Sequence, residues 1–484
     1  MKFTKFFAGA AALIIAGTFL SGQHTVPRYS SVSAADESFT EGVSGTLSYK
    51  NYGSYAVISD CDESVSEVTV PDYIDGIPVT EIGSRAFSNC LALTSVKLPE
   101  TLTAIGDYAF SKCISLPSVT IPAATKKIGD YAFTGCSKLG TLNIPENLTD
   151  FGHKSFNDSA WLNARRSESP FVTVNNILID GLTCTNEITI PDGITAIGTG
   201  AFYDNSSISR VVIPDSVTSV GAKAFQFCER LAEIKIPSGI SEIGMDAFSD
   251  TQWINNQQKI SPFVIVNGIL IDGKECSGSI TIPDNVTKIA DGAFMGCQSL
   301  VSVNIPASVR SIGECVFVFC SKLVSAEISE NTESIGRRAF YWCMNLESVT
   351  INNPDCVIYD SLDTFQNDFC NSGSEFFSGT IYGIENSTAQ AYADKYCCFF
   401  GVTGAVNVPE MVCGDADGDG KTGISDVVAV MSYAKNKAVY PLSYEALKRA
   451  DVFKRGDGVT IADALSIRKK LAQKIEKLPE SHLY

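Results

Sequence analysis

The nine residues IGSRAFSNC, Ile82 to Cys90, recur along the chain and decide its fold. The phrase returns as IGDYAFSKC, IGDYAFTGC, VGAKAFQFC and IGRRAFYWC, each time with phenylalanine at the sixth position. Successive phenylalanines lie 23 or 46 residues apart: Phe87, Phe110, Phe133, Phe156, Phe202, Phe225, Phe248, Phe294, Phe317 and Phe340. Where the spacing doubles, we expect Ile179 and Ile271 to take the same position, in NNILIDG and NGILIDG. The period therefore predicts twelve consecutive structural repeats.

Each repeat also holds a strand signal that ends at proline, as in LTSVKLP, LGTLNIP, LAEIKIP and LVSVNIP. Alternation along the first of these places Val96 and Leu98 toward the interior, and Ser95 and Lys97 toward solvent. The proline then ends the strand. Because a repeat of this size cannot bury its own apolar side, the repeats must stack. Twelve stacked coils would form a β-rich solenoid about 55–60 Å long, at roughly 4.8 Å per strand.

A longer period is visible as well. The stretch WLNARRSESPFVTVNNILIDG returns as WINNQQKISPFVIVNGILIDG, with Trp161 and Trp253 separated by 92 residues. Since 92 is four times the short period, a block of four coils is duplicated. The two tryptophans could be exposed anchors for a partner, but we expect them to pack into the core of an irregular coil.

Seven of the sixteen cysteines share one position, three residues after the phenylalanine: Cys90, Cys113, Cys136, Cys228, Cys297, Cys320 and Cys343. The same position holds Ser159, Asn205 and Thr251 in other repeats. This exchange with small polar residues predicts a buried position where a compact side chain meets backbone groups. A disulfide remains open for the cysteines outside it, Cys356, Cys370, Cys397, Cys398 and Cys413. The CxxC spacing of a zinc site is absent.

The consensus LxxVxIPxxVTxIGxxAFxxC resembles the BspA-like (Treponema-type) leucine-rich repeat over about residues 45–402. The closing stretch TIYGIENSTAQAYADKY resembles the terminal cap of that family, in which a short helix covers the last apolar face. The resemblance implies a leucine-rich-repeat solenoid used for surface adhesion or protein binding, and it implies no catalytic chemistry.

The outward strand positions are expected to form the concave, ligand-facing surface of this solenoid. They are either a solvated Ser/Thr surface, which we favour, or a protein-binding surface. They hold no aromatic side chain, so they give no support for a polysaccharide cleft. The pairs are Ser95/Lys97, Ser118/Thr120, Thr141/Asn143, Arg210/Val212, Glu233/Lys235, Ser302/Asn304, Ser325/Glu327 and Ser348/Thr350.

No enzyme is predicted. The chain has three histidines, and the motifs GxSxG and HExxH are absent. Although carboxylates are plentiful, none recurs in a motif that would single out a glycosidase pair. The net charge of −17 argues against binding of nucleic acid.

The N-terminus predicts export. Lys2 and Lys5 precede the apolar run FFAGAAALIIAGTFL, and a polar stretch leads to SVSAADE. We interpret residues 1–34 as a signal peptide cleaved after Ala34, because the apolar run is too short to span a bilayer. The mature protein is therefore expected outside the cell, without insertion into a membrane.

A compact cluster of carboxylates, DADGDGKTGISD, lies near the end of the sequence. It fits a twelve-residue calcium loop, with Gly420 at the sharp turn at position 6 and Gly423 leaving room for a bridging water at position 9. Such a ring of hard oxygen ligands suits calcium. The predicted ligands are Asp415, Asp417, Asp419, Lys421 through its backbone carbonyl, and Asp426.

A second loop, DVFKRGDGVTIAD, precedes the helix signal ALSIRKKLA. It has thirteen residues, and Phe453 stands where a carboxylate or amide is usual. We expect weaker calcium binding here, through Asp451, Asp457, the carbonyl of Val459, and Asp463.

The first loop closes with aspartate, where an EF-hand sensor uses glutamate, and the helix signal VVAVMSYA follows at once. This combination resembles the type I dockerin, with a second loop of ruminococcal type, over residues 412–478 after a linker at 403–411. The resemblance implies a small all-α module with two EF-hand-like loops and two calcium ions, which docks to a cohesin domain of a cellulosome scaffoldin. Val427, Val430, Ala464 and Leu465 would form its core. The family's cohesin contacts fall on Ile424, Ser425, Met431, Ser432, Ile461, Ala462, Arg468 and Lys469.

Two functions remain open at this point. The first is a non-catalytic cellulosome component, attached through cohesin, whose solenoid presents a recognition face to a protein, a cell or plant material. The alternative is a dockerin-bearing enzyme that takes part in polysaccharide catabolism.

Overall fold

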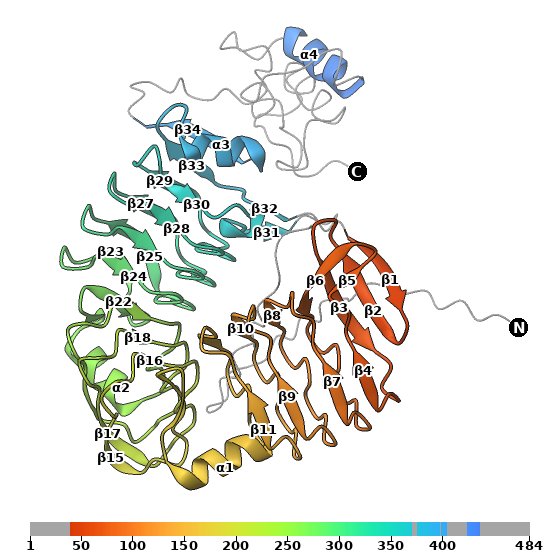
Figure 1. Ribbon diagram of the computed structural model, residues 1–484. Coiled ribbons are helices and arrows are strands. Elements are labelled where there is room, and N and C mark those ends of the chain that lie inside the picture. The colour runs from red at the N-terminus through yellow and green to blue at the C-terminus, as the bar shows by residue number, and fades with distance from the viewer. Residues whose placement is uncertain (1–38, 370–374, 397, 404–423, 436–484) are drawn as a thin grey trace, which may run out of the picture. The chain divides into compact units, whose positions relative to one another are not determined.

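Each repeat forms one coil with two strands, and equivalent strands of successive coils pair in parallel (Figure 1). The computed structural model describes residues 39–369, 375–396, 398–403 and 424–435. The longer strand of a coil precedes the proline, as β7 (Ser95–Lys97) does, and these strands form what we call the long-strand sheets. The shorter strand ends at the isoleucine before glycine, as β8 (Ala104–Ile105) does, and these form the short-strand sheets. As predicted, Ser95 and Lys97 are exposed and Leu98 is buried.

The first segment, residues 40–168, opens with antiparallel strands and closes with helix α1 (Ala160–Glu168). Its short-strand sheet contains β1 (Thr40–Ser44), β2 (Leu47–Asn51), β3 (Ala56–Cys61), β6 (Ile77–Ile82), β8, β10 (Lys127–Ile128) and β12 (Asp150–Phe151), with β5 (Tyr73–Ile74) paired to β6. On the other side, β4 (Glu67–Thr69) pairs with β7, and β9 (Ser118–Thr120) pairs with β11 (Thr141–Asn143).

The second segment, residues 172–260, repeats this plan and closes with helix α2 (Gln252–Ile260). Its short-strand sheet contains β13 (Val172–Val174), β14 (Ile177–Asp180), β16 (Ala196–Ile197), β18 (Ser219–Val220) and β20 (Glu242–Ile243). Its long-strand sheet contains β15 (Asn186–Thr189), β17 (Ile208–Val212) and β19 (Glu233–Lys235).

The third segment spans residues 264–402. Its short-strand sheet contains β21 (Val264–Val266), β22 (Ile269–Asp272), β24 (Lys288–Ile289), β26 (Ser311–Ile312), β28 (Ser334–Ile335) and β30 (Val357–Ile358). Its long-strand sheet contains β23 (Gly278–Thr281), β25 (Leu300–Ile305), β27 (Ser325–Ile328), β29 (Ser348–Ile351), β33 (Thr380–Gly383) and β34 (Phe399–Val402).

The terminal cap predicted from the sequence contains the expected short helix, α3 (Thr388–Lys395), whose Ala389, Tyr392 and Ala393 are buried. The Tyr392 ring meets Phe365 edge-on at 5.3 Å, so the helix covers the last ring of the core. The single-turn helix η1 (Leu362–Thr364) and the pair β31 (Asp368–Phe369) and β32 (Glu375–Phe376) precede it. The last described element of the chain is helix α4 (Ile424–Lys435).

The sequence predicts a continuous stack of twelve coils, but the stack in the structure is interrupted twice. Parallel pairing stops after β12 and again after β20, and at both places a helix and an antiparallel hairpin replace regular coils (Figure 1). In both places the residue in the cysteine position caps the helix. The hydroxyls of Ser159 and Thr251 accept the N–H groups of Leu162 and Ile254, at 3.1 Å each, and so cap α1 and α2.

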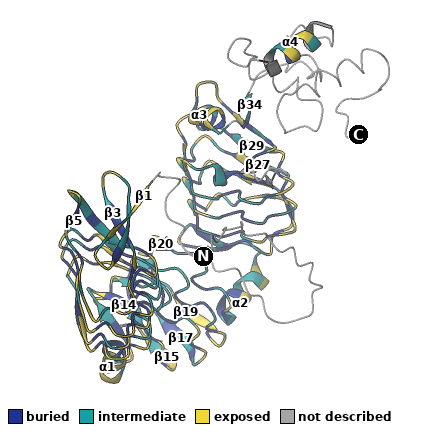
Figure 2. Cartoon of the chain, turned by 90° about the vertical axis from the view of Figure 1, so that its right-hand side faces the viewer, coloured by how far each residue is buried: buried dark blue, intermediate teal, exposed yellow. Residues whose placement is uncertain are grey.

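The phenylalanines form the predicted ladder inside each segment, where buried and exposed positions alternate along the strands (Figure 2). Phe110 stacks on Phe87 at 4.9 Å and on Phe133 at 5.1 Å. The expectation for Ile179 and Ile271 was wrong, because both are half-buried and stand outside the ladder. In those coils the rings of Phe202 and Phe294 lie against Gly181 and Gly273, where any Cβ would collide with them.

Trp161 and Trp253 end the first two ladders. Both are buried, and each ring packs 5.1 Å from the last phenylalanine of its segment, Phe156 or Phe248. The expectation of core packing is therefore confirmed.

At each junction between segments one asparagine bonds to the preceding coil. Asn175 donates its Nδ2 to the carbonyls of Pro145 and Leu148 at 2.9 and 2.8 Å. Asn267, 92 residues later, donates to Pro237 and Ile240 at 2.9 and 3.1 Å. Both asparagines have φ of +50°, a region that asparagine tolerates better than most residues. The same contact therefore joins the first segment to the second and the second to the third.

Candidate functional site

The outward side of the long-strand sheets holds the residue pairs that the sequence assigned to the ligand-facing surface. A shallow hollow of about 350 Å³ lies on this side in the third segment, over β23, β25, β27 and β29. Three of the predicted pairs line it: Ser302/Asn304, Ser325/Glu327 and Ser348/Thr350. The remaining predicted pairs lie on the first two segments and are not part of this hollow.

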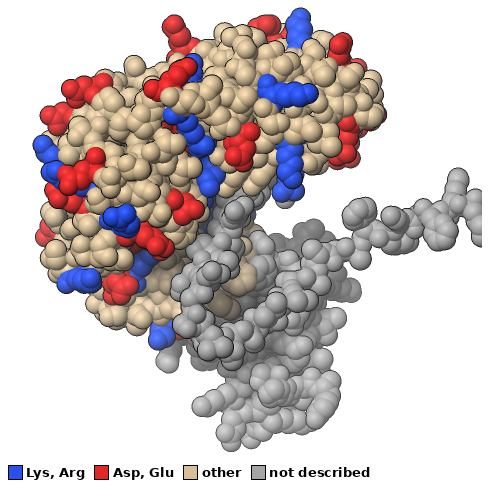
Figure 3. All heavy atoms as spheres, turned by 90° about the horizontal axis from the view of Figure 1, so that it is seen from below, with Lys and Arg blue, Asp and Glu red and all other residues tan. Residues whose placement is uncertain are grey.

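Corresponding positions of the other segments are occupied differently. In the second segment Arg210 lies between two carboxylates, 3.4 Å from Glu187 and 3.0 Å from Glu233. In the first segment Asn143 donates to Thr120 at 3.1 Å. Acidic and basic side chains are also interspersed over the face of the molecule that Figure 3 displays. In the third segment, by contrast, the side chains of Asn304, Glu327 and Thr350 line the hollow and are not paired with one another.

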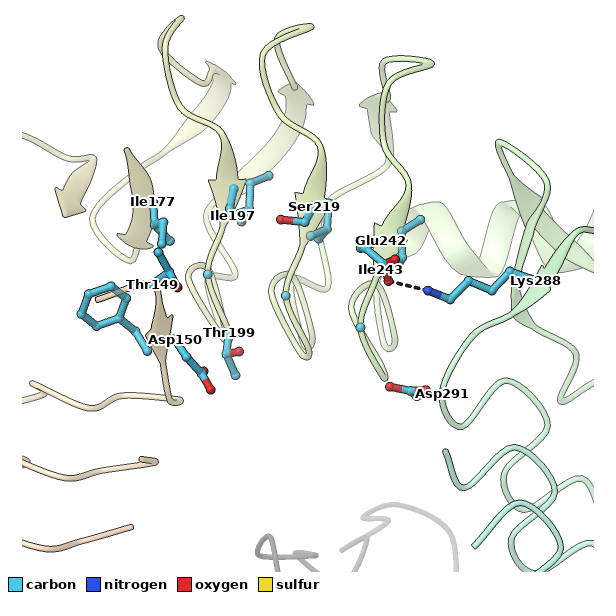
Figure 4. Close-up of a pocket in the computed structure, with 16 residues that line it drawn as sticks. Thr149, Asp150, Ile177, Ile197, Thr199, Ser219, Glu242, Ile243, Lys288 and Asp291 are labelled. Carbon is cyan, nitrogen blue, oxygen red and sulfur yellow. Dashed lines mark hydrogen bonds and ion pairs between the residues drawn. The ribbon is translucent and has the colours of Figure 1, made fainter. Parts of the chain in front are cut away.

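A second hollow, of about 270 Å³, lies on the short-strand side and was not foreseen from the sequence (Figure 4). The first segment contributes Asp150, the second contributes Ser219 and Glu242, and the third contributes Lys288 and Asp291. Glu242 forms an ion pair with Lys288 across the junction between the second and third segments (Figure 4). No pattern in the sequence indicates this hollow, because its lining comes from coils far apart in the chain.

Asp291 lines the same hollow. Burial raises the pKa of its carboxyl, although the N–H of Glu314, donating at 2.8 Å, works in the opposite direction. Its Oδ1 thereby holds the next coil in place. Because the carboxylate already has this structural task, we assign no catalytic role to it.

A buried charged cluster at the same junction also has a structural explanation. Lys274 Nζ lies 2.9 Å from Asp246 and 3.9 Å from Asp272. Burial alone would raise the pKa of Asp246, but the charge and hydrogen bond of Lys274 lower it, whereas burial prevails at Asp272 and raises its pKa. In the duplicated unit Arg166 pairs with Asp180 at 2.7 Å instead. Asp180, which is equivalent to Asp272 by the 92-residue period, is thus paired with a different cation. This difference indicates that the charged cluster has a packing role.

The cysteine position is a structural site, as expected. Thiols donate to the phenylalanine carbonyl of the preceding coil: Cys113 to Phe87 at 3.1 Å and Cys228 to Phe202 at 3.1 Å. Burial raises the pKa of Cys228 to about 12, so this thiol is protonated at neutral pH. Where the position holds Asn205, its amide donates to three carbonyls of the preceding coil.

Helix α4 carries part of the predicted docking module. It begins at Ile424, which is position 10 of the predicted loop starting at Asp415, so Asp426 falls in its first turn. Val430 is fully buried, while Val428 and Met431 are 57% and 52% exposed. Ser432 is half-buried.

The other residues predicted for the module lie outside the described part of the chain, in whole or by their side chains. They are the loop residues Asp415, Asp417, Asp419, Lys421, Asp426, Asp451, Asp457, Val459 and Asp463, and the contact residues Ile424, Ser425, Ile461, Ala462, Arg468 and Lys469.

Between residues 39 and 435, apart from the gaps given above, three or more His, Cys, Asp or Glu side chains nowhere gather as metal ligands would. Nor does any helix in the described part of the chain have the length and apolar character needed to cross a membrane.

Several known proteins resemble parts of this chain. A xylanase/beta-glucanase from Ruminococcus flavefaciens is 36% identical over 78 residues, which cover 14% of this chain and 10% of the relative. The chain thus spans about a tenth of the length of that curated relative. Among solved structures, a leucine rich cell surface protein from Faecalibacterium prausnitzii A2-165 is 27% identical, with 66% of this chain and 90% of that chain covered and a TM-score of 0.28. A leucine-rich repeat protein from Bacteroides ovatus ATCC 8483 is 19% identical, with 76% and 99% covered and a TM-score of 0.26.

The repeat family is assigned from a family match, because these TM-scores are too low to carry an argument. The family described as the BspA type leucine rich repeat region matches residues 58–178, 168–262 and 274–389, which is more than half of the chain. Its repeats coincide with the coils that carry the phenylalanine ladder and the cysteine position. The chain belongs to the BspA-type leucine-rich repeat family.

Proposed function

We propose that this protein is a secreted, non-catalytic cellulosome component. Its C-terminal dockerin folds around calcium and docks to a cohesin domain of a scaffoldin, while its leucine-rich repeat solenoid presents a binding face to a protein or a surface. The observation that carries the docking part is the acidic loop Asp415–Asp426, which runs directly into helix α4.

The donor set fits calcium. Four aspartates at positions 1, 3, 5 and 12 offer hard oxygen atoms, and the glycine at position 6 permits the sharp turn. Because α4 starts at position 10, the closing residue Asp426 belongs to a regular helix and to its first turn, where a carboxylate is favoured by the helix dipole. Calcium bound there would offset the repulsion among these carboxylates and so stabilise the folded module.

Two further observations support the proposal. The match to the xylanase/beta-glucanase is local, and its length is close to that of residues 412–478, as a module shared between otherwise different proteins would be. The binding part of the proposal rests on the repeat family, since stacked repeats build extended surfaces suited to recognition.

The same relative favours an alternative, a dockerin-bearing enzyme that degrades polysaccharide. Hydrolysis of a panel of plant glycans by the purified protein separates the two. Activity that disappears when one exposed carboxylate of the solenoid is changed to its amide, while the protein stays folded, would establish the enzyme.

Docking is tested with the full-length protein on immobilised cohesins, with calcium and with a chelator. Capture should require calcium and should be lost in the double variant Asp415→Ala/Asp417→Ala. Glu330→Ala, which removes an exposed carboxylate of the solenoid, is the control and should be captured like the wild type. Calcium binding without capture by any cohesin would refute the cohesin partner, and absence of calcium binding would refute the loop.

A further inference from the structure

Outward side chains of the third long-strand sheet lie in two straight rows, because its strands pair in register. Parallel pairing aligns β23 with β25, β25 with β27, β27 with β29, and β29 with β33. One row consists of hydroxyls: Ser279, Ser302, Ser325, Ser348 and Thr380. The other, which we call the mixed row, consists of Thr281, Asn304, Glu327, Thr350 and Tyr382. With strands about 4.8 Å apart, each row extends about 19 Å along the stack.

The polar groups of the mixed row are available to a ligand. Asn304, Glu327 and Thr350 line the hollow of about 350 Å³, and no side chain of the three takes part in a hydrogen bond or ion pair within the described protein. This contrasts with the first segment, where Asn143, at the same repeat position as Asn304, is bonded to Thr120. An exposed donor or acceptor without an internal partner can exchange its water for a ligand at little cost.

The mixed row ends in an aromatic ring. Tyr382 is paired with Thr350 on one side and with Gly401 on the other, and it is 36% exposed. Its ring edge packs over Gly401, which has no side chain to cover it. The sequence pairs contained no aromatic residue, since β33 and β34 follow the cap insertion and fall outside the repeat phase. The structure therefore adds an aromatic ring to a surface that otherwise offers hydroxyl, amide and carboxylate groups.

This chemistry does not suit a polypeptide. The backbone of the inner strands is already paired on both sides, so a peptide cannot add as a further strand here. The hollow contains no lysine or arginine and no exposed large apolar pocket of the kind on which protein interfaces depend. Its single charged residue, Glu327, disfavours anionic ligands.

We propose that the hollow and the mixed row bind one chain of a neutral, β-linked polysaccharide. The chain lies along the row with about one sugar for each coil, because the spacing of the strands is close to the repeat of an extended β-linked glycan. Its hydroxyls bond to Asn304, Glu327 and Thr350, and the C–H face of one sugar stacks on Tyr382. The proposal rests on the recognition role of the solenoid and is independent of the docking module.

The test measures binding of the full-length protein to glycans. Isothermal titration with β-1,4-linked hexasaccharides of glucose, xylose and mannose is combined with electrophoresis through gels that contain the corresponding soluble polysaccharides. At least one glycan should bind, and Tyr382→Ala and Asn304→Ala should each weaken binding about tenfold. Glu327→Gln should bind the neutral glycan with unchanged affinity, because it retains the hydrogen-bonding oxygen. It should gain affinity for polygalacturonate, because it removes the negative charge.

Asn143→Ala is the matched control, since it removes the same residue from the same repeat position of the first segment. Its affinity should equal that of the wild type. The proposal is overturned if no glycan of the panel binds, if Asn143→Ala weakens binding as much as Asn304→Ala, or if a protein ligand depends on Tyr382 while glycans do not bind. Capture by cohesin in the same samples separates failure of this site from failure of the docking module.

Discussion

Aspartates two residues after the isoleucine that ends a short strand carry a hydrogen bond from one coil to the next. Asp130 accepts the N–H of His153 at 2.7 Å, and Asp291 accepts the N–H of Glu314 at 2.8 Å. Burial raises the pKa of both carboxyls. The buried negative charge therefore destabilises the folded state. The carboxyl oxygen stabilises the stack, because it accepts the hydrogen bond from the next coil.

Asp291→Asn should stabilise the protein at pH 7, because the amide oxygen can accept the same N–H without a buried charge. The folded pKa of Asp291 lies above its unfolded value, so the wild type regains stability as pH falls through the folded pKa. The advantage of the variant should thus be largest near pH 7, shrink as pH falls through the folded pKa, and be gone below about pH 4, where the unfolded carboxyl is protonated as well. Melting temperatures of the two proteins between pH 3 and pH 7 provide the measurement.

Asp62→Asn is the opposite control. Hydrogen bonds from the hydroxyl and N–H of Ser64 lower the pKa of Asp62, so its stabilising contribution is present at neutral pH and lost as pH falls through the folded pKa. This variant should be no more stable than the wild type at pH 7. A gain like that of Asp291→Asn would contradict the role of burial.

Many individual residues were predictable from the sequence. The phenylalanine and cysteine positions follow from the period, and the structure places both in the core. Ile179 was misjudged because counting residues cannot detect that a hairpin has replaced a coil. Gly181, two residues later, is the residue that meets the ring of Phe202.

Helices α1 and α2 show how one residue type changes an element. In most coils the position after the phenylalanine turn holds cysteine, whose thiol donates backward to a carbonyl, as in Cys136 to Phe110 at 3.0 Å. Serine or threonine there accepts forward from an N–H and begins a helix. The sequence contains this signal, but the exchange of cysteine with serine or threonine does not by itself distinguish a helix cap from a neutral substitution within the ladder.

Ser159→Cys should destabilise the protein by about 1 kcal/mol, although cysteine is the commonest residue at this position of the repeat. The thiol is a weak acceptor and cannot replace the cap on the N–H of Leu162. Chemical denaturation measures the loss, and Ser159→Thr, which resembles Thr251 at the start of α2, should be nearly neutral. Equal stability of the cysteine variant would mean that α1 does not depend on its cap.

Asn175→Ala should cost about 2–3 kcal/mol, because it removes two hydrogen bonds across the first junction and places alanine at positive φ. Asn175→Gly should be less harmful, since glycine accepts that φ and only the hydrogen bonds are lost. Thermal unfolding of both variants tests this order. If glycine is as harmful as alanine, the backbone conformation contributes nothing measurable at this junction.

On the scale of the whole molecule, the core is divided into three clusters that coincide closely with the three segments. Repeat proteins derive their stability from interactions within repeats and between neighbouring repeats, so damage to one cluster should stay local. The two junctions then determine how far the segments unfold together.

Phe225→Ala, in the middle of the second ladder, should cost about 3–5 kcal/mol. Amide hydrogen exchange should show lost protection mainly within residues 172–260. Protection lost equally in all three segments would contradict the division of the core. Phe317→Ala is the matched variant, and its effect should be confined to residues 264–402.

The candidate sites were predictable only in part, for a geometric reason. Three pairs of the long-strand hollow were identified because they lie at one repeat position, whereas Tyr382 was missed because the cap insertion shifts it out of phase. The short-strand hollow brings Asp150 and Asp291 to one surface from different segments. Which residues of different segments line one hollow depends on where the stack of coils is interrupted. The repeat pattern of the sequence does not predict those interruptions.

The repeated junction gives this architecture a simple route to change its length. Asn175 and Asn267 close two interfaces of the same design, and each segment brings its own starting hairpin and its own finishing element. Copying or deleting the 92 residues between them would create no new kind of junction and would leave no apolar core surface exposed to solvent. A gene encoding this chain could therefore gain or lose coils in whole blocks, while the third segment and the residues that follow it are inherited unchanged.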